Sequence, residues 1–256
     1  MPRNKARSVR VEAIVLKHSD FGEADRVLTL YSREEGKLRA IAKGARKTHS
    51  RKAGHVEPFS QVRLQLARGK NFFIVSQAEA INTHTVLAED LERLGYASYV
   101  VELLERFSVD EDANQVLYRL LRDTLNRLED KRQEQVAIRF YEIQLLDQLG
   151  FRPELHECLN CNKDVQAEDQ FFSAQRGGVL CPDCGPADAS AHPISMDALK
   201  YLRHFQRSDY GEALRAQMSQ AVRLELEILM NHYLTYLLEK RLNSPRFLRR
   251  VRRERS

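Results

Sequence analysis

Four cysteines, arranged in two pairs, constrain the fold of this chain more than any other feature of its sequence. The first pair is Cys158 and Cys161, the second is Cys181 and Cys184, and the sequence contains no other cysteine. Each pair reads Cys-x-x-Cys, and residues 162–180 separate them. This spacing is typical of a zinc ribbon, in which two tight turns each present two thiolates to one tetrahedral ion. Because four thiolates leave no open position for water, the expected Zn2+ is structural.

The residues between the two pairs predict a hairpin. Phe171-Phe172 and Val179-Leu180 are short apolar runs, and Gly177-Gly178 lies between them. Two apolar runs joined by a glycine-containing turn are typical of paired antiparallel strands. Such a hairpin would return the second cysteine pair to the first.

Other uses of the four cysteines are less well supported. Two disulfides require an oxidising compartment, but the first ten residues are polar and basic and do not form a secretion signal. A redox Cys-x-x-Cys usually lies in a βαβ setting, and neither pair opens an obvious helix after a strand. Four thiolates also suit iron, so iron stays an alternative. His156, beside the first pair, is expected at the surface and not as a fifth ligand.

Length and charge narrow the class of protein. A chain of 256 residues exceeds the usual single core, which predicts two or three modules. No run of eighteen apolar residues is present to cross a membrane. The net charge is only +5, and its excess is concentrated in residues 37–52 and 246–255. Local basic stretches on a nearly neutral chain favour contact with a polyanion.

The first eighty residues predict a small β-barrel. Five β-rich segments are separated by turn chemistry, with one longer insertion between the third and the fourth, which matches the strand count of an OB-type barrel. Phe72 and Phe73 are adjacent, so one is expected inside the barrel and the other outside, either packed on protein or stacked on a base. The expected strands are residues 9–17, 26–31, 37–43, 61–67 and 72–77.

The third expected strand carries a basic face. Its apolar residues alternate with cations, and a basic loop that starts at Gly44 follows it directly. A basic strand face that leads into a basic loop suits a phosphate backbone, but a solvated edge strand protected against aggregation is an equal alternative. The candidate phosphate-backbone contacts are Lys37, Arg39, Lys43, Arg46, Lys47, Arg51 and Lys52, with Arg63 on the outward face of the fourth strand.

From Leu87 onward the apolar residues follow a helical period. Helical runs are expected up to Gly150 and again after Ser195, a candidate N-cap, and the last run, residues 212–242, is either one helix or two helices broken near Asn231. The sequence therefore predicts an α+β protein in which an N-terminal OB-type β-barrel precedes a helical domain interrupted by a four-cysteine zinc ribbon. The expected parts are residues 1–83 (barrel), 84–153 and 191–245 (helical domain), 154–190 (zinc ribbon) and 246–256 (basic tail).

No catalytic motif is visible in the sequence. It contains no phosphate-binding Gly-x-x-x-x-Gly-Lys-Ser/Thr loop, no Gly-x-Ser-x-Gly nucleophile turn and no His-Glu-x-x-His helix. Its adjacent carboxylates fall in turns or at helix starts, where they suit the helix dipole better than acid–base chemistry. The expectation is a binding protein and not an enzyme.

Several blocks of sequence, spread over nearly the whole chain, carry a family resemblance. They are AIVLK (13–17), FGEADRVLTL (21–30), GKL (36–38), AKGARK (42–47), PF (58–59), GFRPEL (150–155), GGVL (177–180), YLLEKRLNS (236–244) and the four cysteines. In this order they resemble the bacterial RecO family, the recombination mediators of the RecFOR repair pathway. Some members of that family lack the cysteines, which agrees with a structural metal.

The resemblance implies a function in DNA repair and homologous recombination. Such proteins bind single- and double-stranded DNA without sequence preference, anneal complementary strands, and help load the RecA recombinase together with RecR and single-strand binding protein. The resemblance also implies cytoplasmic, nucleoid-associated action, without a membrane or a nucleotide cofactor. It places the DNA contacts on the barrel cations named above. The acidic tail of single-strand binding protein is expected on the helical region, where the candidates are Arg119, Arg122, Arg127, Lys131 and Arg132.

Two rival classes and one undecided segment remain at this stage. A zinc-ribbon RNA-binding or translation-associated factor would share the barrel and the metal, and a non-catalytic adaptor would use the helices and the ribbon for protein contact. The arginine-rich tail, residues 246–255, is either a second strand-holding site or a disordered arm that adds nonspecific affinity.

Overall fold

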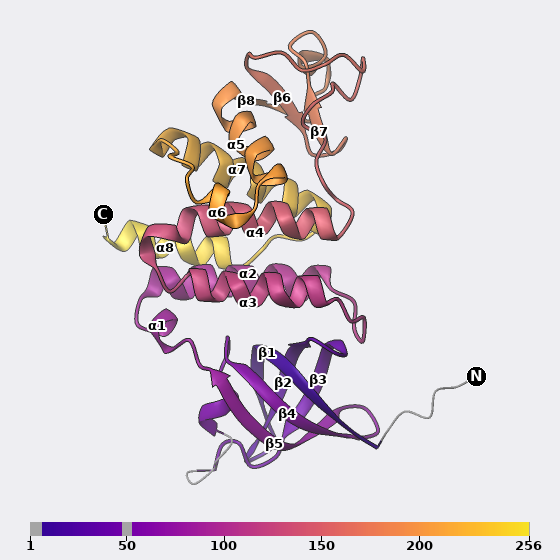
Figure 1. Cartoon of the computed structure of the whole chain (residues 1–256), viewed down its shortest axis with the longest axis vertical. Coiled ribbons are helices and arrows are strands. Elements are labelled where there is room, and N and C mark those ends of the chain that lie inside the picture. Colours follow the sequence, from indigo (N-terminus) through magenta and orange to yellow (C-terminus); the bar gives the residue numbers. More distant parts are fainter. Residues whose placement is uncertain (1–6, 48–52, 256) are drawn as a thin grey trace, which may run out of the picture. The chain divides into compact units, whose positions relative to one another are not determined.

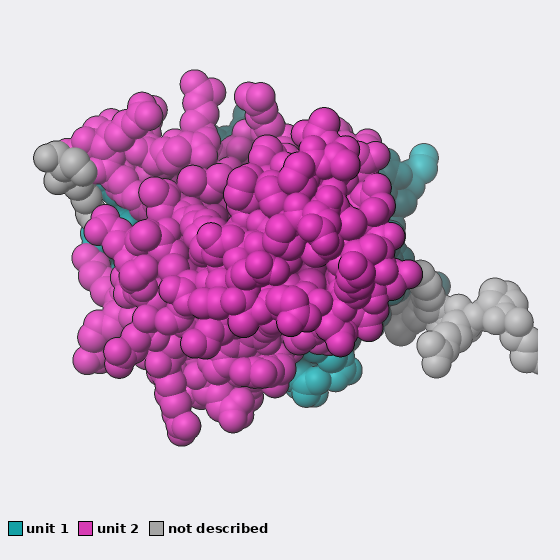
Figure 2. Space-filling model, turned by 90° about the horizontal axis from the view of Figure 1, so that it is seen from above, with its two compact units in different colours: residues 1–129 teal, residues 130–256 magenta. Residues whose placement is uncertain are grey.

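A computed structural model describes residues 7–47 and 53–255 of the chain (Figure 1). The structure divides into two compact units, residues 1–129 and residues 130–256, which Figure 2 shows in different colours. Unit 1 extends beyond the barrel and includes the first three helices, whereas unit 2 contains the remaining helices and the cysteine-rich segment. Within the described residues, no helix is long and apolar enough to cross a membrane.

A closed five-stranded barrel forms the N-terminal part of unit 1, as the sequence predicts. The strands are joined in the order β1-β2-β3-β5-β4, and all neighbours are antiparallel except β3 and β5, which are parallel. The strands are β1 (Ser8–Phe21), β2 (Asp25–Ser32), β3 (Gly36–Ala42), β4 (Gln61–Arg68) and β5 (Phe73–Asn82).

The barrel interior is filled by small and branched apolar side chains. On β3, Leu38, Ala40 and Ala42 are buried and Arg39 is exposed, which confirms the predicted alternation. Phe73 is in this core, whereas its neighbour Phe72 is half-buried outside it. The alternation therefore sets the third strand's charged side chains on the outside of the barrel.

Three helices follow the barrel in unit 1. The predicted helical run from Leu87 is interrupted at Asp90, whose carboxylate accepts hydrogen bonds from the N–H groups of Glu92 and Arg93 and so begins a new helix. Asn114 caps the third helix in the same way. The helices are α1 (Thr85–Ala88), α2 (Leu91–Phe107) and α3 (Gln115–Arg127).

Unit 2 is helical, and a small three-stranded sheet with the order β7-β6-β8 interrupts it after α4. The sequence predicts the interruption and its hairpin, but not the third strand, β8. The Ser195 hydroxyl accepts from the Ala198 N–H, which confirms the predicted N-cap of α5. The elements of unit 2 are η2 (Lys131–Gln133), α4 (Glu134–Gln148), β6 (Gln170–Ser173), β7 (Gly178–Leu180), η3 (Gly185–Ala187), β8 (Ala191–Ile194), α5 (Met196–Arg207), α6 (Tyr210–Ala213), α7 (Gln220–Leu238) and α8 (Ser244–Arg255). One further 3-10 turn, η1 (Ala53–His55), belongs to unit 1.

The C-terminal helices differ from the sequence prediction in two respects. A break near Asn231 is wrong, because α7 continues through this residue and the interruption lies before Ser219, which caps α7. The disordered-arm alternative for the tail is also wrong, because these residues form α8, in which Leu248 and Val251 are buried. Burial of two apolar side chains one turn apart gives this arginine-rich segment a reason to be helical.

Candidate nucleic-acid interface and metal centre

The two cysteine pairs meet in unit 2, at the small sheet. The four Sγ atoms all lie within 4.8 Å of one another, and the Cys161 and Cys181 sulfurs are 3.8 Å apart. With a zinc–sulfur bond of about 2.3 Å, the edge of a regular tetrahedron is about 3.8 Å. The cluster therefore fits a single metal ion, as the spacing predicts, and the donor set of four sulfurs suits zinc.

Backbone geometry prepares the sulfurs for a cation. In each pair the chain turns back on itself, with Asn162 N–H donating to the Cys158 carbonyl and Cys184 N–H donating to the Cys181 carbonyl. The Cys181 N–H also donates to the Cys158 sulfur at 3.3 Å. Burial raises the pKa of Cys158, but hydrogen bonds from the backbone of Cys181, Cys161 and Asn160 outweigh it and lower this pKa to about 6. The Cys158 thiolate is therefore favoured at neutral pH. Cys184 shows the opposite shift, because a hydrogen bond from Asn160 lowers its pKa but hydrogen bonds with Cys181 and the other cysteines, together with burial, raise it to about 11.

The predicted hairpin between the pairs is present. Strands β6 and β7 are antiparallel, with Phe171 opposite Leu180 and Ser173 opposite Gly178. Gly177 has a φ of +76°, which a glycine adopts without strain. A Cβ on Gly178 would overlap the backbone of Glu154, so the first pair packs closely against the hairpin only because this position is glycine.

The side-chain ammonium of Lys37 on β3 is occupied by contacts with other residues of unit 1. Its ammonium donates to the carbonyls of Glu105, at 2.9 Å, and of Ser108, and it pairs with Asp110 at 3.3 Å. The last carbonyls of a helix have no partner within that helix, so this cation satisfies the C-terminal end of α2. Only 16% of the Lys37 side chain is exposed, which separates it from the other predicted contacts.

Three of the predicted DNA contacts are open to solvent. Arg39, Lys43 and Lys47 are exposed, and none of them forms an ion pair with another residue in the described part of the chain. Arg46 is exposed too, but it pairs with Asp20 at 3.3 Å and reaches the Gly22 carbonyl. The open cations thus lie on β3 and on the turn after it.

The remaining predicted contacts are placed differently. Arg63 on β4 pairs with Glu79 on β5 at 3.1 Å, and β5 separates β4 from β3 in the barrel. On β5, Glu79 lies opposite Arg63, and Phe73, six residues earlier, lies opposite Ala40 of β3. Six residues of a strand span about 20 Å, so Arg63 is about 20 Å along the sheet from Ala40. Arg51 and Lys52 lie outside the described residues. The role of all these residues in DNA binding stays a prediction.

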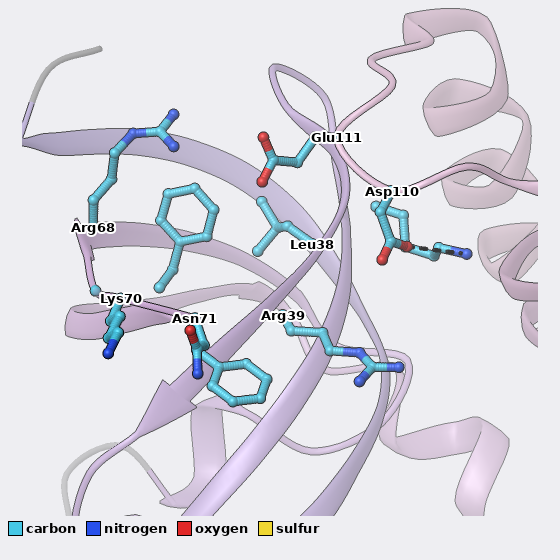
Figure 3. Close-up of a pocket in the computed structure, with 11 residues that line it drawn as sticks. Leu38, Arg39, Arg68, Lys70, Asn71, Asp110 and Glu111 are labelled. Carbon is cyan, nitrogen blue, oxygen red and sulfur yellow. Dashed lines mark ion pairs between the residues drawn. The ribbon is translucent and has the colours of Figure 1, made fainter.

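A hollow of about 230 Å³ lies beside Arg39, one of the open cations on the barrel. Figure 3 shows Arg39 from β3, Arg68 and Lys70 from the end of β4 and its turn to β5, and Glu111 from the loop between α2 and α3. This barrel hollow is lined by Lys37, Leu38, Arg39, Arg68, Gly69, Lys70, Asn71, Phe72, Phe73, Asp110 and Glu111.

The α2–α3 loop closes one side of the barrel hollow because β3 begins with a glycine. Gly36 has a φ of +69°, and a Cβ there would overlap the carbonyl of Asp112. The loop then joins the strand edge, where the Glu111 N–H donates to the Lys37 carbonyl at 2.8 Å. The carboxylates of this loop therefore stand at the rim of an otherwise basic hollow.

Sequence reasoning missed the contribution of the β4–β5 turn. It identified residues 68–71 as a turn and not as part of the site, although Arg68 and Lys70 lie four and two residues before Phe72. The parallel pairing of β3 with β5 brings this turn beside Arg39. The Arg68 guanidinium lies 4.9 Å from the centre of the Phe73 ring and is held there, while Lys70 is exposed. Two cations next to an aromatic pair were the available signal.

The predicted partner contacts on the helices are divided between the two units. In unit 1, Arg119 is exposed on α3 and Arg122 pairs with Asp123 at 2.7 Å. Arg127 is half-buried at the end of α3. In unit 2, Arg132 pairs with Asp130 at 3.1 Å, next to the exposed Lys131. Their role in binding single-strand binding protein stays a prediction.

Comparison with known proteins decides the family. The sequence model for "Recombination protein O N terminal" matches residues 7–84, and the model for "Recombination protein O C terminal" matches residues 88–246. The chain belongs to the RecO family. This confirms the resemblance found in the sequence.

Similar RecO proteins come from several bacteria. A protein of Roseiflexus sp. (strain RS-1) is 41% identical, with 96% of this chain and 87% of the relative covered. One from Pelotomaculum thermopropionicum is 37% identical (94% and 93% covered), and one from Dehalococcoides mccartyi (strain 195) is 35% identical (92% and 93% covered). All three are called "DNA repair protein RecO", and membership of this family supports a role in DNA repair.

Proposed function

We propose that this chain is a recombination mediator that binds single- and double-stranded DNA and anneals complementary strands. Together with RecR, it helps load RecA onto DNA coated with single-strand binding protein. The proposed place of action is the nucleoid in the cytoplasm. The observation that carries the proposal is the set of open cations Arg39, Lys43 and Lys47 on β3 and the turn after it, of which Arg39 lines the barrel hollow, in a member of a DNA repair family.

The open cations suit a backbone contact that does not read sequence. Phosphate contacts position a strand without distinguishing its bases, so a row of Lys and Arg serves any strand. Phe72 is half-buried at the barrel hollow, where a base can stack on its ring. Stacking contributes about 1–3 kcal/mol per base and tolerates every base. Cations and one aromatic surface together favour single strands, whose bases are free to stack.

Annealing requires no catalytic group in this mechanism. Pairing of complementary strands is downhill, and the barrier that a protein can lower is the mutual repulsion of two phosphate backbones. Cations that neutralise both backbones lower that repulsion and leave the base edges free to pair. We propose accordingly that the chain is not an enzyme and uses no nucleotide cofactor.

The four-cysteine cluster has a structural role in the proposal. Cys158, Cys161, Cys181 and Cys184 would hold one Zn2+, which supplies cross-links between the two turns and has no open coordination position for a reactant. The chain's own contribution is the arrangement of the sulfurs and the N–H groups that donate to them. A structural role explains a site closed by four sulfurs better than a catalytic role does.

Salt dependence of DNA binding tests the proposed function. Contact with about six phosphates of a single strand predicts a log–log slope of affinity against salt of about −4. The measurement is fluorescence anisotropy with labelled oligonucleotides of two unrelated sequences, which should give the same slope. A slope near zero, or binding only to structured RNA, would contradict the proposal and favour the RNA-binding alternative.

A further inference from the structure

Helix α8 carries a basic surface that lies almost entirely beyond the part of the chain matched by the family. The C-terminal family model ends at residue 246, whereas α8 continues to Arg255. The helix is attached to unit 2 by Arg252, whose guanidinium pairs with both carboxylate oxygens of Glu227 on α7, at 2.9 and 3.0 Å. Leu248 and Val251 are buried. The surface therefore belongs to an ordered element.

Four arginines gather on another face of α8. They occur at intervals of three, four and seven residues, which places them on one side of a helix. All four are exposed, and together with Asn243 and Phe247 they line a hollow of about 480 Å³. This arginine face consists of Arg246, Arg249, Arg250 and Arg253.

The arginine face has little internal neutralisation. Arg250 pairs with Glu254 at 3.7 Å, and both side chains are largely exposed, so the pair contributes little. The other three guanidiniums form no ion pair with any residue that the structure describes. Like charges three or four residues apart on a helix repel one another, so an anion bound between them would relieve this repulsion.

The geometry points to a phosphate backbone as the ligand. A guanidinium donates in a planar fork that matches two phosphate oxygens, which a lysine cannot do. From Arg246 to Arg253 the helix rises about 10.5 Å, which is about the axial length that three phosphates of one strand occupy in duplex DNA. Among the described residues that line the hollow, Phe247 is the only apolar one, so a repeated charge fits this surface better than a peptide that needs apolar anchors.

We propose that the arginine face of α8 is a second nucleic-acid site, which binds backbone phosphates independently of the barrel. The inference rests on the proposed function in one respect, because the barrel must hold the first strand. With one strand on the barrel cations and another on α8, a single chain can hold two backbones.

A fourfold substitution on α8 tests the inference. Arg and Gln have similar helix propensities, and the residues that attach the helix are kept, so α8 is expected to remain folded. The variant is R246Q/R249Q/R250Q/R253Q. A matched control removes the same charge at exposed positions elsewhere in unit 2, and it is K200Q/R207Q/R215Q/R223Q.

Two measurements on the full chain are compared, with circular dichroism as the check on folding. Loss of four phosphate contacts predicts that the salt slope for single-stranded DNA becomes about 3 less steep, and that annealing of two complementary oligonucleotides slows by about tenfold or more. The control variant is expected to keep the wild-type slope and rate. Equal behaviour of the α8 variant and the control would overturn the inference.

Failure of the inference and failure of the proposed function are distinguishable. If the wild-type chain neither binds nor anneals DNA, the proposed function is wrong, and the second site falls with it. If the wild type anneals and only barrel substitutions impair it, the proposed function stands and the α8 site is wrong. Loss of poly-glutamate binding by the α8 variant, with DNA binding and annealing intact, would also overturn the inference and assign the face to an acidic peptide.

Discussion

The barrel and the four-cysteine ribbon are held together by different means. The barrel closes on itself and buries a continuous set of Val, Leu and Ala side chains from all five strands. The ribbon has three strands of three or four residues, too short to bury a comparable core, and its sulfurs converge on one point. A small segment of this kind depends on a metal, whereas the barrel does not. Metal dependence and DNA binding are therefore expected to be separable.

Metal removal gives the largest expected effect. Structural zinc sites contribute about 10–16 kcal/mol of binding free energy, so C158S/C181S or a strong chelator should open the ribbon. The measurements are metal content by mass spectrometry and limited proteolysis of residues 154–190. DNA affinity of the barrel is expected to remain. H156A serves as the control, because His156 is exposed beside the cluster and is not a ligand. A ribbon that resists protease without metal would contradict this comparison.

Neutralising the open cations of the barrel should weaken DNA binding and leave the metal site intact, which is the opposite of the effect of metal removal. R39A/K43A/K47A removes three side chains that are free to contact phosphates, and the salt slope for single-stranded DNA should become about 2 less steep. Metal content and helicity are expected to be unchanged. K200A/R207A/R223A removes equal charge from exposed positions of unit 2 and is the control. An unchanged slope in the barrel variant would show that the barrel is not the main site.

Lys37 separates folding from binding within the barrel unit. K37M removes the donor that serves the Glu105 and Ser108 carbonyls, and loss of hydrogen bonds to a charged group costs about 1.5–3 kcal/mol of unfolding free energy. Urea denaturation of the variant checks this value. DNA affinity should change much less than in R39A/K43A/K47A. A large loss of affinity with unchanged stability would assign Lys37 to the DNA contact instead.

Acidity should weaken the barrel slightly through Glu57. Burial raises the pKa of this carboxyl, but hydrogen bonds from Arg26 and His18 and their charges outweigh burial and lower it. A lowered folded-state pKa stabilises the fold above the unfolded value of 4.5, and this contribution is lost as the pH falls through the folded value. The urea midpoint of E57Q should therefore depend less on pH below about 4.5 than the wild-type midpoint does. Identical pH profiles would remove Glu57 from this account.

The sequence predicts elements that depend on local pattern, because alternation and capping act over a few residues. The barrel strands, the Ser195 cap and the cysteine hairpin are all of this kind. By contrast, the parallel pairing of β3 with β5 joins segments that are distant in sequence. No local signal places the β4–β5 turn beside Arg39.

Charge identity is predictable from the sequence, whereas the availability of a charge is not. Lys37 and Arg39 both belong to the outward face of β3. The Lys37 ammonium donates to carbonyls almost seventy residues later in the chain, whereas the Arg39 guanidinium is open to solvent. Arg63 looks equivalent in the pattern, but Glu79 on the neighbouring strand pairs with it. The α8 tail shows the same limit, because its three apolar residues are too few to predict that two of them, Leu248 and Val251, are buried.

The most direct test of the central claim is the rate at which two complementary oligonucleotides coated with single-strand binding protein anneal, with and without this chain and without ATP. We expect strong acceleration that declines as salt rises, since cations that hold two backbones carry the mechanism. Binding of both strands without any acceleration would contradict the account and leave a passive nucleic-acid-binding module.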